Sequence, residues 1–110
     1  MIFPKPIKSL PKASLPFKNA TAYLAQLNNQ QIVFAEFKKT TNVPEHSHTS
    51  QWEVVLEGKV DYFEDGIKHT YKKGDRFFVK SRKKHSAKVY KGYACIMFFN
   101  QKDRYKPLKH

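Results

Sequence analysis

Three histidines carry the clearest chemical pattern in the sequence. His46 and His48 stand two residues apart, shortly before a β-prone run that begins at Gln51. Because side chains two apart on an extended chain project to the same side, we expect both imidazoles to face together. His85 opens a later β-prone run and is the natural third nitrogen ligand. These imidazoles, joined by the Gln51 amide, could converge on a divalent transition metal.

The alternative interpretation is a pair of solvated histidines, because His-x-His alone is a weak pattern. Other chemistries have less support. We find no Ser-His-Asp arrangement, no glycine-rich phosphate loop and no paired-carboxylate site in the sequence. Cys95 lies in an apolar run, where a thiol is inert rather than nucleophilic. As the single cysteine of the chain, it also excludes an internal disulfide.

The length of 110 residues supports about one domain, and 40% hydrophobic with 15% aromatic content supports one core. Prolines at positions 4, 6, 11 and 16 interrupt every apolar run near the N-terminus. The segment therefore fits neither a signal-peptide core nor a membrane span. Together with the absence of a disulfide framework, this predicts a soluble cytoplasmic protein.

The formal charge of +12 is concentrated at the two ends of the chain. Residues 1–30 carry +4, residues 31–79 carry −1 and residues 80–110 carry +9. The densest basic run spans residues 80–84. A solvated loop is the preferred interpretation of this run, and an anion- or nucleic-acid-binding surface is the alternative. The chain has no zinc-finger spacing and no basic helix that would favour nucleic acid.

Short β-prone runs separated by turn signals fill the chain from residue 21 onward. The expected strands are followed by a basic tail, 101–110, and preceded by a proline-rich arm, 1–19. We expect about eight strands, an all-β sandwich or barrel over residues 20–100, and helix only near the C-terminus. Asp65-Gly66 marks the strongest hairpin. The expected strands cover residues 21–27, 31–38, 51–57, 59–64, 67–72, 76–80, 85–90 and 93–100, with a loop through Pro44.

A wider pattern around the histidines is similar to a known family. Pro44-x-His46-x-His48-x2-Gln51-x6-Gly58 resembles the first motif of the cupin superfamily, with Gln in the usual Glu position. Gly74-x10-His85 resembles the second motif. The resemblance covers roughly residues 31–100 and is strongest to small single-domain bacterial cupins.

The resemblance implies a double-stranded β-helix, or jelly roll, with a metal inside the barrel. Its ligands would be His46, His48, Gln51 and His85, and open coordination sites would take water or substrate. A neutral Gln ligand should make the metal a stronger Lewis acid and bind it less tightly than Glu would. The ligand types accept Zn, Fe, Ni, Mn or Co, so the metal is not identified.

The second motif departs from the family pattern. Lys80 and Arg82 stand where Pro and Gly are usual, and Val89 stands where Asn is common. We therefore expect an unusual backbone before His85, with Lys80 or Arg82 bordering the barrel mouth and suited to an anionic substrate. The alternative is that these departures from the family motif have abolished metal binding.

Strand alternation predicts that Glu53 shares the inward face of Gln51. Glu53 could accept a proton beside a bound metal, or it could simply pair with a lysine near the barrel end.

The first functional hypothesis is a metalloenzyme of isomerase, lyase or oxygenase type that acts on a small polar or anionic metabolite. The alternatives are a non-catalytic ligand- or metal-sensing cupin and a basic nucleic-acid-binding module. Cupins of this size are commonly homodimers, which we expect here.

Overall fold

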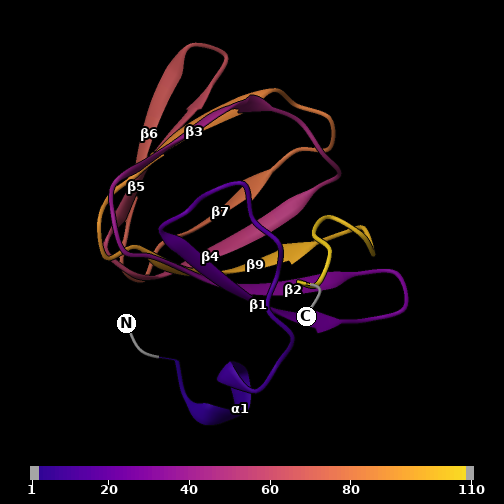
Figure 1. Ribbon diagram of the computed structural model, residues 1–110. Coiled ribbons are helices and arrows are strands. Elements are labelled where there is room, and N and C mark those ends of the chain that lie inside the picture. The colour runs from indigo at the N-terminus through magenta and orange to yellow at the C-terminus, as the bar shows by residue number, and fades with distance from the viewer. Residues whose placement is uncertain (1–2, 109–110) are drawn as a thin grey trace.

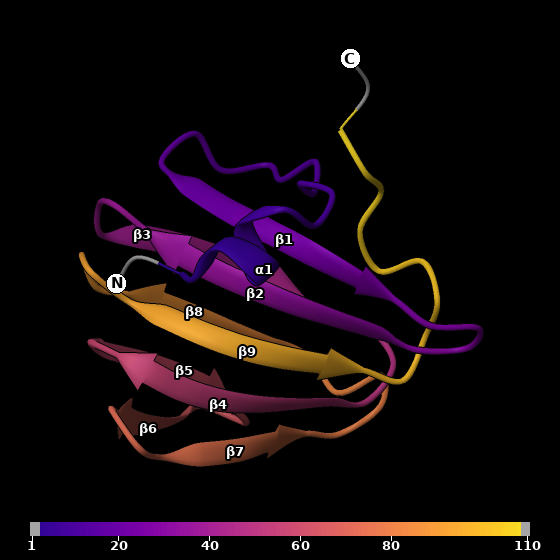
Figure 2. The same ribbon diagram turned by 90° about the horizontal axis from the view of Figure 1, so that it is seen from below.

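The computed structural model describes residues 3–108 and consists of two antiparallel sheets facing each other (Figures 1 and 2). One sheet has five strands in the order β1-β2-β9-β4-β7, and the other has four in the order β3-β8-β5-β6. The strands are β1 (Ala20–Gln26), β2 (Gln31–Phe37), β3 (Thr41–His46), β4 (Gln51–Glu57), β5 (Lys59–Glu64), β6 (Ile67–Lys72), β7 (Arg76–Val79), β8 (His85–Val89) and β9 (Ala94–Phe99). The predicted all-β jelly roll is confirmed.

The period-2 pattern of β4 produces the two faces that the sequence predicts. Gln51, Glu53 and Val55 point inward and are buried, whereas Trp52 is exposed on the outer face. The strand is followed by Gly58, whose φ of +73° suits a residue without a Cβ. A Cβ at Gly58 would lie 2.9 Å from the Cα of Tyr93, so the glycine also permits close packing against the chain before β9.

Strand β3 corrects the expectation of a loop through Pro44. It pairs antiparallel with β8, and its register shifts between Val43 and His46. Because β3 is an edge strand and the shift falls at Pro44, the missing N–H of the proline removes no regular ladder bond. The structure therefore has nine strands within residues 3–108 instead of about eight.

The N-terminal segment also differs from expectation, because the helix of the described chain lies there and not near the C-terminus. Helix α1 (Lys5–Lys8) is a single turn that begins after Pro4, where a proline without an N–H is tolerated. The segment then runs along the edge of β1, where Ala13 N–H donates to the Ala22 carbonyl. No helix within residues 3–108 is long and apolar enough to cross a membrane.

The described part of the basic tail folds back onto the barrel. Gln31, which is 1% exposed, donates to the Tyr105 carbonyl at 2.9 Å and accepts the Tyr105 N–H at 3.0 Å. The N–H of Leu108 donates to the carbonyl of Lys12 at 2.8 Å. These contacts bring Arg104 and Tyr105 to the opening of the barrel.

Candidate metal centre and cavity

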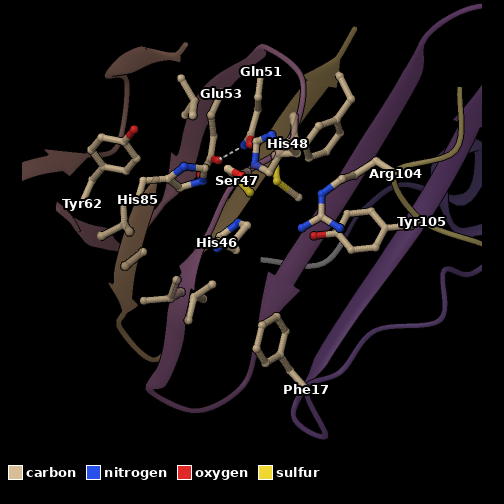
Figure 3. Close-up of a pocket in the computed structure, with 18 of the residues that line it drawn as sticks. Phe17, His46, Ser47, His48, Gln51, Glu53, Tyr62, His85, Arg104 and Tyr105 are labelled. Carbon is tan, nitrogen blue, oxygen red and sulfur yellow. Dashed lines mark hydrogen bonds between the residues drawn. The ribbon is translucent and has the colours of Figure 1, made fainter. Parts of the chain in front are cut away.

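The three histidines named from the sequence lie together. His46 is at the end of β3 and is the register partner of His85 at the start of β8, while His48 comes from the loop before β4. The ring centroids of His46 and His85 are 4.2 Å apart, and the His48 ring lies 4.8 Å from that of His85. One ligand atom from each side chain falls within 4.8 Å of the others, so the cluster could hold a metal ion (Figure 3).

Each imidazole is fixed by a backbone carbonyl. Because a carbonyl can only accept, each Nδ1 must be the protonated nitrogen, which leaves the Nε2 lone pair free to bind a metal. This arrangement is the usual outer support of metal-binding histidines. The contacts are His46 Nδ1 to Pro44 O at 2.9 Å, His48 Nδ1 to Thr49 O at 2.6 Å and His85 Nδ1 to Lys83 O at 2.9 Å.

The surroundings of His48 and His85 favour their neutral forms. Burial lowers the pKa of His48 to about 4, and the positive charge of Arg104 adds to this effect. Burial also lowers the pKa of His85, with smaller contributions from His46 and Arg104. Neutral imidazoles can bind a metal near pH 7 without first releasing a proton.

Gln51 and Glu53 form a buried pair beside the cluster. The Gln51 amide nitrogen donates to Glu53 Oε1 at 2.6 Å, and the Tyr93 hydroxyl donates to Glu53 Oε2. Burial raises the pKa of Glu53 to about 7, although hydrogen bonds from Tyr93, Cys95 and Gln51 oppose the shift. The carboxyl group thus has a tyrosine and an amide as partners, and no ion pair between Glu53 and a lysine occurs within residues 3–108.

An open cavity of about 1330 Å³ lies between the sheets, with the histidine cluster in its wall. Aromatic side chains from both sheets and from the two terminal segments line the rest of it (Figure 3). They include Phe17, Phe37, Tyr62, Phe77, Phe99 and Tyr105. A cavity of this kind, mostly apolar with a few converging polar groups, is typical of a small-molecule site.

The two basic residues predicted at the mouth take different positions. Arg82 lines the cavity, and its backbone N–H donates to the His48 carbonyl at 2.6 Å. Its φ of +61° is left-handed, the conformation for which glycine is favoured, so the unusual backbone expected before His85 is observed. Lys80 is exposed and is not among the residues that line the cavity.

Sequence reasoning missed Arg104 and Tyr105, which border the cavity from beyond the barrel strands (Figure 3). They belong to a segment predicted only as a basic tail. Their placement depends on Gln31, which is more than 70 residues away in the sequence, so no local pattern could indicate it.

Cys95 is buried and burial raises its pKa, as expected of an inert thiol.

Comparison with solved structures places the chain in a fold class. A cupin described as RmlC-like, from Shewanella frigidimarina, is 25% identical with a TM-score of 0.72, and the match covers 86% of each chain. KdgF from a Halomonas species is 18% identical with a TM-score of 0.70, and the match covers 83% of this chain and 87% of that one. A cupin superfamily protein from Desulfitobacterium hafniense is 17% identical with a TM-score of 0.70, covering 80% and 83%.

Protein-family models and curated proteins give no match to the sequence. The two-sheet architecture, the histidine cluster and these structural matches nevertheless agree. The chain is a small cupin-type domain. Structures with the same fold include enzymes, among them an oxalate decarboxylase and a salicylate 1,2-dioxygenase.

Proposed function

We propose that this cupin binds a divalent transition metal through His46, His48, His85 and Gln51 and acts as a metalloenzyme on a small anionic metabolite. The observation that carries the proposal is the set of Nδ1 contacts, which leaves three Nε2 atoms free at the wall of an open cavity. Unliganded surface histidines have no need of such support.

The donor set fits a metal such as Zn, Fe, Ni, Mn or Co. Three imidazole nitrogens are available, and Gln51 can offer its amide oxygen because its nitrogen is engaged with Glu53. A metal held by neutral ligands retains its full charge and would polarise a carbonyl or carboxylate oxygen, or acidify bound water.

The chain supplies a proton carrier as well as a binding cavity. Glu53 has a pKa of about 7, which suits a group that must both take and give a proton near neutral pH. Its Oε1 is oriented by Gln51 and its Oε2 by Tyr93, so the carboxyl group is preorganised. Aromatic rings line the cavity that Glu53 borders.

The reaction class is isomerase, lyase or oxygenase. Two proteins of the same fold are named for reactions of carboxylate-bearing compounds, a decarboxylase for oxalate and a dioxygenase for salicylate that was solved with gentisate. Both are much longer chains, since the matches cover only 31% and 26% of them. They support a carboxylate substrate here without indicating which one.

Metal content and turnover together test the proposal. Untagged protein is analysed by elemental mass spectrometry, reconstituted with each candidate metal and assayed against a panel of small carboxylates and sugars. We expect near-stoichiometric metal and metal-dependent conversion of a panel member. Stoichiometric metal with ligand binding but no turnover would instead support a sensing cupin.

We also propose a homodimer, as expected from the sequence, formed through the outer face of the five-stranded sheet. Phe98, Trp52 and Phe78 are register neighbours on β9, β4 and β7, and they are 40%, 44% and 53% exposed. The chain's own Phe3 covers the other end of this face by packing on Tyr23 and Phe34.

Phe98, Trp52 and Phe78 carry no charge, but Arg76 lies beside them, with its guanidinium carbon 5.7 Å from the Trp52 ring centroid. The row offers an apolar contact surface, and a dimer formed there must accommodate one Arg76 from each copy. Light scattering tests this: we expect a dimer that Phe98→Lys converts to a monomer, and a monomeric wild type would contradict it.

A cytoplasmic location completes the proposal and is consistent with the unpaired Cys95.

A further inference from the structure

Arg104 occupies a position that the proposed chemistry has not used. It follows β9 and lines the cavity that contains the histidine cluster. In Figure 3 its guanidinium extends into the cavity beside the ring of Tyr105, on the side opposite His85. The three histidines line the same cavity. Arg104 and the candidate metal centre therefore face one ligand-sized space.

The guanidinium is held by aromatic rings and not by a carboxylate. Its central carbon lies 4.4 Å from the ring centroid of Tyr105 and 5.7 Å from that of Phe99. No ion pair with an acidic residue and no side-chain hydrogen bond involves Arg104 within residues 3–108. Its Nε is buried and lacks a hydrogen-bond partner. A buried donor without a partner is uncommon and calls for a ligand or ordered water.

The charge of the cavity favours an anion at this position. Arg82, Arg104 and Lys106 line it, whereas Glu53 is the one acidic residue among the lining residues. Both Glu53 oxygens are already engaged by Gln51 and Tyr93. A divalent metal bound by neutral ligands would add further positive charge. Such a cavity is best balanced by a ligand that brings negative charge of its own.

We propose that Arg104 is a substrate-anchoring residue that binds a carboxylate of the ligand, while the remainder of the ligand reaches toward the histidine cluster. This rests on the proposed function for the role of the metal, but the Arg104 contact itself needs no metal. The planar guanidinium fork matches a carboxylate in two parallel hydrogen bonds. The rings of Phe99 and Tyr105, whose planes meet at 82°, pack against the guanidinium and hold it at the wall of the cavity.

The inference also names the ligand class more closely. A ligand that contacts both Arg104 and the metal would carry a second oxygen group, so small dicarboxylates and hydroxy- or oxo-carboxylates fit best. Succinate and its diamide, succinamide, are suitable probes because succinamide lacks both carboxylates at nearly constant shape. Inorganic phosphate serves as the competing anion.

Calorimetric titration of the three probes into wild-type protein tests the assignment, in metal-loaded and metal-free forms at fixed ionic strength. We expect succinate to bind more tightly than succinamide or phosphate. Arg104→Gln should weaken succinate about ten- to hundredfold and remove most of the preference over succinamide, because a charge-assisted contact is lost. Lys102→Gln is the matched control, since Lys102 is exposed and lies outside the cavity. It should leave both affinities unchanged.

The outcomes separate this inference from the proposed function. Equal succinate affinity in wild type and Arg104→Gln, or no millimolar binding of succinate to wild type, would overturn the role of Arg104. A preference for phosphate would overturn the carboxylate assignment. Failure to bind metal would instead overturn the proposed function, while the metal-free titrations would still decide the role of Arg104. Thermal denaturation shows whether each variant is folded. Arg104→Lys keeps the positive charge but lacks the planar guanidinium, so it tests whether the paired hydrogen bonds are needed.

Discussion

The Gln51 amide nitrogen lies 2.6 Å from Glu53 Oε1, and this hydrogen bond orients the amide next to the histidine cluster. A carboxylate can only accept, so the nitrogen of the amide faces Glu53 and the oxygen is left for another partner. Glu53 thus affects the candidate metal centre by orienting the Gln51 amide.

Two substitutions of Glu53 separate its shape from its charge. Glu53→Gln keeps an acceptor for Gln51, so we expect metal content close to that of wild type but loss of any proton-transfer activity. Glu53→Leu leaves the Gln51 amide and the Tyr93 hydroxyl without a partner, and we expect both metal affinity and stability to fall. Elemental analysis and urea unfolding measure these effects. Wild-type metal affinity in Glu53→Leu would show that Gln51 needs no such support.

Tyr93 stabilises the barrel through its contact with Glu53. Tyr93→Phe keeps the ring that packs on Phe37 but removes the hydroxyl, so a buried carboxyl group loses a donor. We expect the free energy of unfolding to fall by about 1–3 kcal/mol. Tyr23→Phe is the control, because the Tyr23 ring is also buried and its hydroxyl makes no hydrogen bond within the described residues. Similar losses in both variants would contradict a specific role for the Tyr93 hydroxyl.

The two glycines Gly58 and Gly66 share a φ of +73° but differ in their surroundings. Gly66→Ala faces open space and should cost about 1–2 kcal/mol for the left-handed backbone. Gly58→Ala adds a contact of 2.9 Å with the Tyr93 backbone, and we expect a further loss of about 1–3 kcal/mol. Equal costs, measured by urea unfolding, would show that close packing at Gly58 contributes nothing.

Asp61 should make stability depend on pH in acid. Hydrogen bonds from the Tyr90 and Thr70 hydroxyls lower its pKa in the folded protein. A lowered folded pKa means that the contribution is complete above the unfolded pKa of about 3.9 and is lost as pH falls through the folded value. The stability difference between wild type and Asp61→Asn should therefore shrink in this range. Glu45→Gln is the control, because Glu45 is exposed and makes no ion pair or side-chain hydrogen bond within residues 3–108. An unchanged difference for Asp61→Asn would contradict the account.

Most of the fold was predictable because alternation and turn residues are local signals. The hairpin at Asp65-Gly66 and the inward face of β4 follow from the sequence alone. Strand β3 was missed because Pro44 normally excludes a strand, and only its edge position with a register shift permits one. The histidine cluster was predicted, whereas Arg104 was not, because its position depends on contacts between segments distant in the sequence.

The most direct test of the metal centre is the metal content of untagged protein, compared between wild type, His48→Ala and His69→Ala. His69 is exposed and lies outside the cluster, so its loss controls for adventitious binding by a surface imidazole. We predict near-stoichiometric transition metal in wild type and His69→Ala and strong depletion in His48→Ala. Absence of metal from folded wild type after reconstitution, or equal metal in all three proteins, would contradict the account.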